Sequence, residues 1–161
     1  LCASTRSGSE QQRACPICQT GRIAKVGHGL YQLEQWVPDP SDTYAWAVMS
    51  VGPGALLYGE SVIAMLDLAP TNPIRVFVAT PRRTRRKLPE NIKVEWIRGI
   101  KPTTAYNGIP CQSAHDAILA CKGKMLPDRL EAAARTAHER GLISRQQYRT
   151  LRKELESENV H

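Results

Sequence analysis

The side chains best suited to bind a charged ligand are five cations in one short run, residues 81–87. They are Arg82, Arg83, Arg85, Arg86 and Lys87. Residues 81–101 hold eight Lys and Arg and two Glu, so this segment carries +6 of the chain's net charge of +7. Such local charge indicates a contact surface for an acidic partner, most often nucleic acid, with a membrane surface or an acidic protein as alternatives. Cations there would bind phosphate, which gives affinity and salt dependence but no base specificity.

The cysteines and histidines of this sequence lack the spacing of a complete four-ligand zinc site. Cys15 and Cys18 form a CxxC pair, with His28 as the nearest further candidate ligand. Zinc needs four ligands, and the thiols of Cys111 and Cys121 are far away in the sequence. We therefore interpret the pair as a turn with two small apolar residues, and we expect no metal.

An enzyme that acts on nucleic acid would need a carboxylate cluster for a metal, or a nucleophile beside a base. The candidates are Asp67, His115 with Asp116, and His138 with Glu139. Neighbours on a helix project in different directions, so we interpret these side chains as caps or surface groups. The sequence contains no dinucleotide, phosphate-loop, metalloprotease or serine hydrolase motif. We expect a non-catalytic protein without a cofactor.

Two strand-like runs, 74–80 and 92–97, flank the basic run and could pair antiparallel across it. In the second run Ile92, Val94 and Trp96 are expected to point inward, with Lys93 and Glu95 outward. A third extended stretch follows, with a turn at Asn107-Gly108 and a return through 109–111. These segments predict a small, mainly antiparallel sheet.

About five helices complete the expected fold. Ser41 could cap a first helix that ends at 52–54, and a second, apolar on most sides, is expected over about 56–67. Three more follow the strands, and their boundary signals are Ser113 with Asp116, Pro127, Gly141, and Ser144 with Gln147. The narrow stripe of small residues in the fourth helix, Ala133, Ala134 and Ala137, suits close helix packing or a partner protein.

The N-terminal part predicts a β-hairpin over 21–33, with Gly27-His28-Gly29 as its tight turn. Arg22, Lys25 and His28 could project from this hairpin as from a wing, although an ordinary surface hairpin has the same pattern. Two prolines make 37–40 a linker. We expect 1–12 and 157–161 to be tails, the first of them disordered.

Composition indicates a folded protein of the cytoplasm. The 161 residues suit one domain with a small appendage, and hydrophobic residues make up 42% of them. No apolar run reaches the ~18 residues of a membrane span, and no signal sequence is visible. The five cysteines are scattered and odd in number, which favours a reducing compartment.

Five stretches in the same order resemble the AbiEi family of type IV antitoxins, which are bacterial transcriptional repressors paired with a nucleotidyltransferase-like toxin. The stretches are GRIAKVGHGLYQL (21–33), LLYGESVIAMLDL (56–68), IRVFVATPRRTRR (74–86), IPCQSAHDAIL (109–119) and RGLIS (140–144). Together they extend over roughly residues 15–155. The resemblance implies an N-terminal winged helix that reads DNA upstream of the operon, followed by a larger C-terminal domain.

By this resemblance, 15–33 would be the end of the recognition helix and the wing. The implied DNA contacts are Gln19, Thr20, Arg22, Lys25 and His28. Only about 20 residues precede the recognition-helix position, and Pro16 interrupts it, so we expect a truncated winged-helix element. The expected fold is α+β: this element at 13–36, the linker 37–40, and an AbiEi-like α+β domain at 41–156.

The leading hypothesis is a DNA-binding repressor that acts as the antitoxin of a type IV toxin–antitoxin system and binds the operator of its own operon. A cognate nucleotidyltransferase-like toxin is the expected protein partner. Three alternatives remain open for the basic run: a solvated loop without a partner, docking on the toxin, or docking on RNA. For the whole chain, the alternatives are a protein-interaction module that does not read DNA and, less expected, an enzyme that processes nucleic acid.

Overall fold

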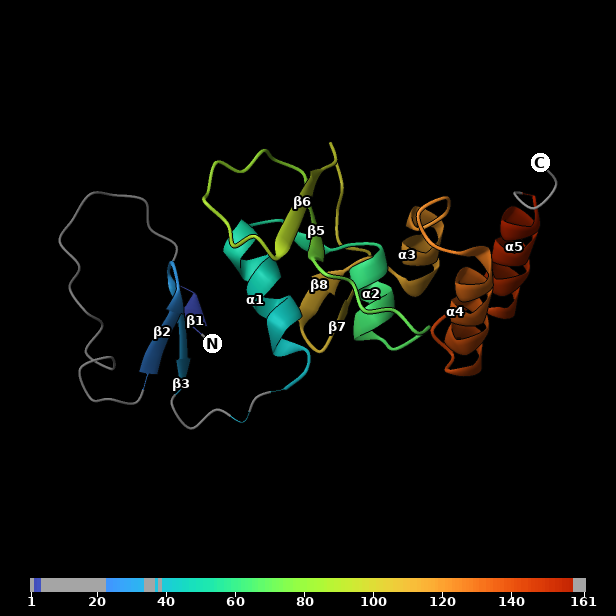
Figure 1. The fold of residues 1–161 in the computed structure, drawn as a ribbon, viewed down its shortest axis with the longest axis horizontal. Helices are drawn as coiled ribbons and strands as arrows, with labels where there is room; N and C mark the ends of the chain where they lie inside the picture. Colours follow the sequence, from blue (N-terminus) through green and yellow to red (C-terminus); the bar gives the residue numbers. More distant parts are fainter. Residues whose placement is uncertain (1, 4–22, 34–36, 38, 158–161) are drawn as a thin grey trace.

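Helices and strands follow one another along the long axis of this α+β protein (Figure 1). The structure is a computed structural model that describes residues 2–3, 23–33, 37 and 39–157. A β-hairpin lies at one end, a mixed sheet with its helices lies in the middle, and a pair of helices lies at the other end. Several predicted features fall partly or wholly outside the described residues, among them most of the 1–12 tail and the CxxC pair.

The central sheet has five strands in the order β6-β5-β4-β8-β7. They are β4 (Leu56–Leu57), β5 (Val76–Thr80), β6 (Ile92–Trp96), β7 (Thr104–Tyr106) and β8 (Ile109–Cys111). β4 pairs antiparallel with β5 and parallel with β8, while β7 and β8 form the expected hairpin around Asn107 and Gly108. The expected sheet is therefore present, but it is mixed rather than mainly antiparallel.

β5 and β6 run parallel, in register from Val76 opposite Ile92 to Thr80 opposite Trp96. The antiparallel pairing predicted for these two strands was wrong. The connection 81–91 does not turn back directly as a hairpin loop would; it returns to the start of the sheet, where the Val76 N–H donates to the Asn91 carbonyl at 2.7 Å. Leu88 is partly buried against the core cluster that α1 and β5 share, and this burial favours the longer path.

Helix α1 (Asp42–Val51) packs on one face of the sheet. Its buried residues Ala47, Val48 and Val51 share a core cluster with Val76 and Val78 of β5. The helix begins where expected, but Ser41 does not cap it with its side chain. Instead, the Ser41 backbone N–H donates to the Asp39 carboxylate at 2.7 Å, and the Ser41 hydroxyl bonds to the same group.

Helix α2 (Glu60–Met65) is shorter than the helix expected over about 56–67. Leu56 and Leu57 form strand β4 instead, because their backbone groups pair with β5 and β8. Gly59, with φ of 52°, then redirects the chain into the helix. The hydroxyl of buried Ser61 accepts a hydrogen bond from the Phe77 N–H at 2.8 Å and so ties α2 to β5.

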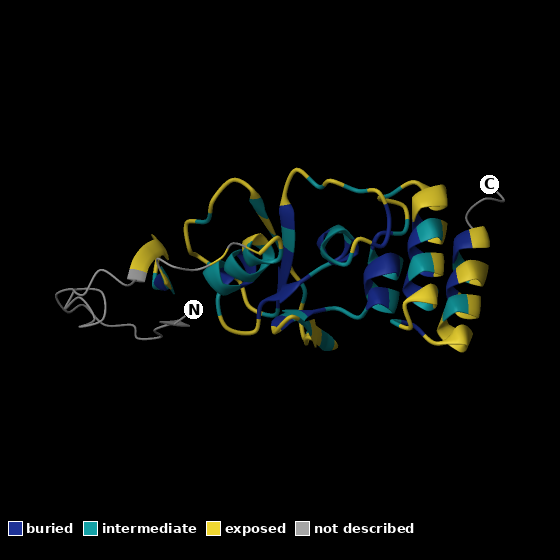
Figure 2. Cartoon of the chain, turned by 90° about the horizontal axis from the view of Figure 1, so that it is seen from below, coloured by how far each residue is buried: buried dark blue, intermediate teal, exposed yellow. Residues whose placement is uncertain are grey.

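The C-terminal helices are α3 (Ala114–Ala120), α4 (Pro127–Glu139) and α5 (Arg145–Glu156). Their predicted boundaries are confirmed: Ser113 caps α3, Ser144 and Gln147 form a capping box on α5, and Pro127 opens α4. Buried residues gather where these helices face one another and the sheet (Figure 2). The stripe of small residues on α4 is fully buried in this cluster, so internal packing accounts for it.

The longest described helix, α4, has 13 residues. A membrane-spanning helix needs about 20 predominantly apolar residues. No helix in the described ranges has the length and apolarity for such a span.

The predicted N-terminal hairpin is confirmed as β2 (Ile23–Gly27) and β3 (Leu30–Leu33), which pair antiparallel around His28 and Gly29. Strand β1 (Cys2–Ala3) pairs with the other side of β3, although the sequence predicts a disordered tail there. Leu30 is buried, and β3 lies against α1. The winged-helix interpretation stays a prediction, because residues 4–22 lie outside the described ranges.

Candidate nucleic-acid interface

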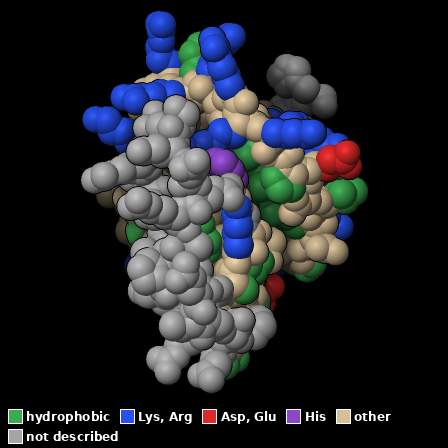
Figure 3. All heavy atoms as spheres, turned by 90° about the vertical axis from the view of Figure 1, so that its left-hand side faces the viewer, with side chains coloured by type: hydrophobic (Ala, Val, Ile, Leu, Met, Phe, Trp, Pro, Cys, Tyr) green, Lys and Arg blue, Asp and Glu red, His purple; other side chains and the backbone are tan. Residues whose placement is uncertain are grey.

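All five cations of the predicted basic run are exposed on the loop 81–91 that joins β5 to β6. This loop and the turn of the β2–β3 hairpin lie toward the same end of the molecule (Figures 1 and 2). Seen from that end, Lys and Arg side chains gather on the upper part of the surface (Figure 3). The fold therefore displays the basic run together with the hairpin.

Hydrogen bonds fix the beginning of the loop. The hydroxyl of buried Thr80 donates to the Arg82 carbonyl at 3.0 Å, and the Arg82 N–H donates back to that hydroxyl at 3.4 Å. The indole N–H of Trp96 donates to the Pro81 carbonyl at 3.2 Å. The backbone of the first cations is thus tied to the ends of both β5 and β6.

Arg83 lies over the ring of Trp96, with its guanidinium carbon 4.6 Å from the ring centroid. The prediction that Trp96 points inward was wrong, since 48% of this residue is exposed. Alternation along a strand predicts burial only where another element covers that face. Trp96 is the last residue of β6 and belongs to neither core cluster. The sequence signal that could have found it is an aromatic residue close to an arginine-rich run.

Arg86 holds the loop against the end of α1. Its guanidinium donates to the Ser50 carbonyl at 3.4 Å, in the last turn of the helix, where the helix dipole favours a cation. Its backbone N–H donates to the Thr84 hydroxyl at 3.2 Å. Arg86 therefore helps to position the loop, and the phosphate contact predicted for it from the sequence stays a prediction.

The turn that follows α1 supports the loop from below. A Cβ on Gly54 would lie 3.3 Å from Cγ of Pro81. Gly54 also has φ of 79°, which residues with a side chain rarely adopt. A Cβ on Gly52 would lie 3.6 Å from the Arg86 guanidinium carbon. These two glycines allow the basic loop to lie directly on the turn.

The other three cations of the basic run are Arg82, Arg85 and Lys87. Each is exposed, and none bonds through its side chain to a residue that the structure describes. Ion pairs between described residues lie elsewhere. They join Lys124 to Glu95, Arg152 to Glu156 and His115 to Asp116. Cations without a neighbouring carboxylate keep their attraction for an anionic partner.

The structure places two of the five predicted N-terminal DNA contacts. Lys25 lies on β2 opposite Tyr31, His28 lies in the hairpin turn, and both are exposed. The other three lie outside the described residues. They are Gln19, Thr20 and Arg22.

No protein-family model and no curated protein matches this chain. The resemblance to AbiEi antitoxins therefore stays a prediction that rests on the sequence stretches themselves.

Two of the side chains considered as catalytic candidates, His115 and Asp116, contact each other at the start of α3. His115 and Asp116 were expected to point apart, but His115 Nδ1 lies 3.2 Å from the Asp116 carboxylate. That carboxylate also accepts the Thr103 hydroxyl at 3.3 Å, and the Asp116 N–H is capped by Ser113. Burial raises the pKa of Asp116, but hydrogen bonds from His115, Ser113 and Thr103 outweigh it and hold the pKa below its ordinary value. The carboxylate is therefore a charged group at the first turn of α3.

The second histidine among the candidates, His138, contacts the neighbouring helix. His138 stacks on Tyr148 with ring centroids 5.0 Å apart, so it packs α4 against α5. Asp67 is exposed just after α2, with φ of 49°. Over the described ranges, no three His, Cys, Asp or Glu residues lie close enough to hold a metal ion. Burial raises the pKa of the Cys111 and Cys121 thiols to about 11, which leaves them unreactive near neutral pH.

Proposed function

We propose that the chain is a cytoplasmic DNA-binding transcriptional repressor that serves as the antitoxin of a type IV toxin–antitoxin system and has no catalytic activity. The observation that carries the proposal is the basic loop. Arg82, Arg85 and Lys87 are exposed, and their side chains bond to no residue that the structure describes, on a backbone that Thr80 and Trp96 hold in place. Such cations bind duplex phosphates and orient a protein on DNA without reading its sequence.

Base recognition falls to the N-terminal element in this proposal. Lys25 and His28 lie on the hairpin, toward the same end as the basic loop, so one duplex could contact both. Gln19, Thr20 and Arg22 are the further candidates that the resemblance supplies. The α4–α5 pair lies at the opposite end, where a nucleotidyltransferase-like toxin could bind without covering the basic loop.

A salt titration of DNA binding tests the proposal. Purified protein is titrated into labelled duplex from the promoter of its own operon and into a scrambled duplex of equal length, at several salt concentrations. We expect tighter binding to the promoter duplex and a steep loss of affinity with salt. Equal binding to both duplexes would show a phosphate-binding surface without an operator reader. No binding at low salt would refute the DNA proposal and favour a protein-interaction module.

A further inference from the structure

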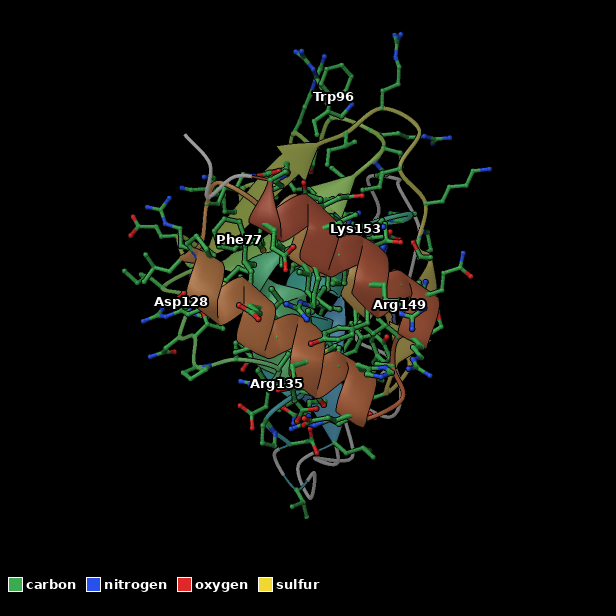
Figure 4. All side chains as sticks on the ribbon, turned by 90° about the vertical axis from the view of Figure 1, so that its right-hand side faces the viewer. Phe77, Trp96, Asp128, Arg135, Arg149 and Lys153 are labelled. Carbon is green, nitrogen blue, oxygen red and sulfur yellow. The ribbon has the colours of Figure 1, made fainter. Side chains whose placement is uncertain are left out.

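Trp96 is an exposed indole in a fixed orientation. It ends β6, which is one of the two edge strands of the central sheet, and its side chain projects away from the C-terminal helices (Figure 4). The bond from its N–H to the Pro81 carbonyl restricts rotation of the ring. The guanidinium of Arg83 lies over the ring at 4.6 Å, yet 48% of Trp96 remains accessible.

Core packing does not account for this position. The sheet core near the strand is formed by Val76, Val78 and Val94, and Trp96 belongs to neither buried cluster. Among described residues, the other large apolar side chains that are exposed are aliphatic, such as Ile74 at 94% and Leu126 at 63%. Trp96 therefore combines, within the described ranges, an exposed aromatic ring, a stacked arginine and neighbouring free cations.

We propose that Trp96 and Arg83 form a stacking site for an unpaired nucleobase, so that the basic loop binds DNA where a duplex opens into single strand. Unpaired bases stack on aromatic rings and on arginine guanidinium planes, whereas bases inside a duplex are already stacked on one another. Arg82, Arg85 and Lys87 contact the phosphates next to the stacked base. The inference rests on the proposed DNA-binding function and names the form of DNA that this site takes.

The test compares three DNA ligands that share one promoter duplex. The first is blunt, the second carries a short thymine extension, and the third carries an extension of abasic nucleotides with the same phosphates. Because stacking is worth about 1–3 kcal/mol per base, we expect the thymine extension to bind at least about fivefold more tightly than the abasic one. Equal affinity for the two extensions would overturn the stacking site. A ribonucleotide extension that gains affinity when the DNA extension does not would also overturn it.

Two substitutions separate stacking from loop positioning. Trp96→Phe and Trp96→Leu both remove the N–H that bonds the Pro81 carbonyl, but only Phe keeps an aromatic face. We expect Trp96→Phe to retain most of the preference for the thymine extension and Trp96→Leu to lose it. Because both variants lack the bond to Pro81, we expect them to bind the blunt duplex as tightly as each other. If both variants weaken all three ligands to the same extent, Trp96 only positions the loop and the proposal fails.

Arg83→Lys gives a check that does not alter the end of β6. It keeps the charge but replaces the planar guanidinium, so we expect the preference for the thymine extension to fall while the salt dependence stays unchanged. An undiminished preference would count against the part assigned to Arg83. Failure of stacking and failure of the proposed function are distinguishable when the scrambled duplex of the salt titration is measured beside these ligands. A blunt promoter duplex that binds selectively without a gain from thymine refutes stacking alone, whereas a gain from thymine without promoter selectivity refutes the repressor.

Discussion

Removing the three unpaired cations of the basic loop should flatten the salt dependence of DNA binding. The variant replaces Arg82, Arg85 and Lys87 by alanine. It keeps Arg83, which stacks on Trp96, and Arg86, which bonds the Ser50 carbonyl. None of the three side chains bonds to a described residue, so their loss should not unfold the loop. The variant therefore reports on contacts with DNA rather than on stability.

The size of the effect follows from counterion release. Each phosphate neutralised on duplex DNA contributes about 0.9 to the slope of log affinity against log salt, so three lost contacts lower the slope by about 2.7. Between about 50 and about 200 mM salt, the wild type should then lose roughly 40-fold more affinity than the variant. Fluorescence anisotropy with labelled promoter duplex at a series of salt concentrations measures both slopes.

A matched control removes the same charge from the other end of the molecule. Arg135 on α4, with Arg149 and Lys153 on α5, are exposed on the far helices (Figure 4). Alanine at these three positions lowers the net charge equally, but at a site remote from the loop, where salt screens the interaction. We expect its slope to match the wild type. A slope reduced as much as in the loop variant would refute the assignment of the contacts to the loop, as would an unchanged slope in the loop variant itself.

Three further predictions concern the fold. Gly54→Ala should lower the free energy of unfolding by about 1 kcal/mol or more in a urea titration, because its Cβ meets Pro81 at a positive φ; wild-type stability would contradict the close approach. Cys111 and Cys121 should resist alkylation at about pH 8 in the native protein, where a thiol with a pKa of about 11 is only about one part in a thousand ionised; peptide mapping that finds them labelled as fast as after denaturation would contradict this burial. Asp116→Asn should lower the melting temperature above pH 3.8, because the carboxylate stabilises the fold only while it is charged. The difference in melting temperature between wild type and variant should shrink as the pH falls through the lowered pKa of Asp116 in the folded protein. A difference independent of pH would contradict the assigned hydrogen bonds.

Features that depend on residues close in sequence could be predicted. The hairpin turn at His28 and Gly29 and the turn at Asn107 and Gly108 need positive φ angles, and three of these four residues are glycine or asparagine. Capping by Ser113 likewise depends on a backbone N–H only three residues away. In each case the chemistry of a few neighbouring residues decides the conformation.

Features that depend on distant partners could not be predicted. Leu56 and Leu57 suit a helix as well as a strand, and they become a strand because β5 and β8 offer backbone groups on either side. The alternation around Trp96 predicts the two faces of β6, but it does not predict which part of a face a helix will cover. The candidate site divides in the same way: the sequence predicts the cations, while the contact of Arg86 with Ser50 exists only in the folded chain.

The shared direction of β5 and β6 also sorts the charges of this segment by sign. Parallel strands end at the same edge of a sheet, so the chain leaves Thr80 and Trp96 side by side. Arg98 and Lys101 follow β6 and are exposed, which adds a second basic segment to the edge where Arg82 and Arg83 follow β5. Glu90 comes just before β6 and so lies toward the opposite edge. If β5 and β6 were antiparallel, Glu90 would lie at the edge where Arg82 and Arg83 follow β5, and Arg98 and Lys101 would lie at the opposite edge.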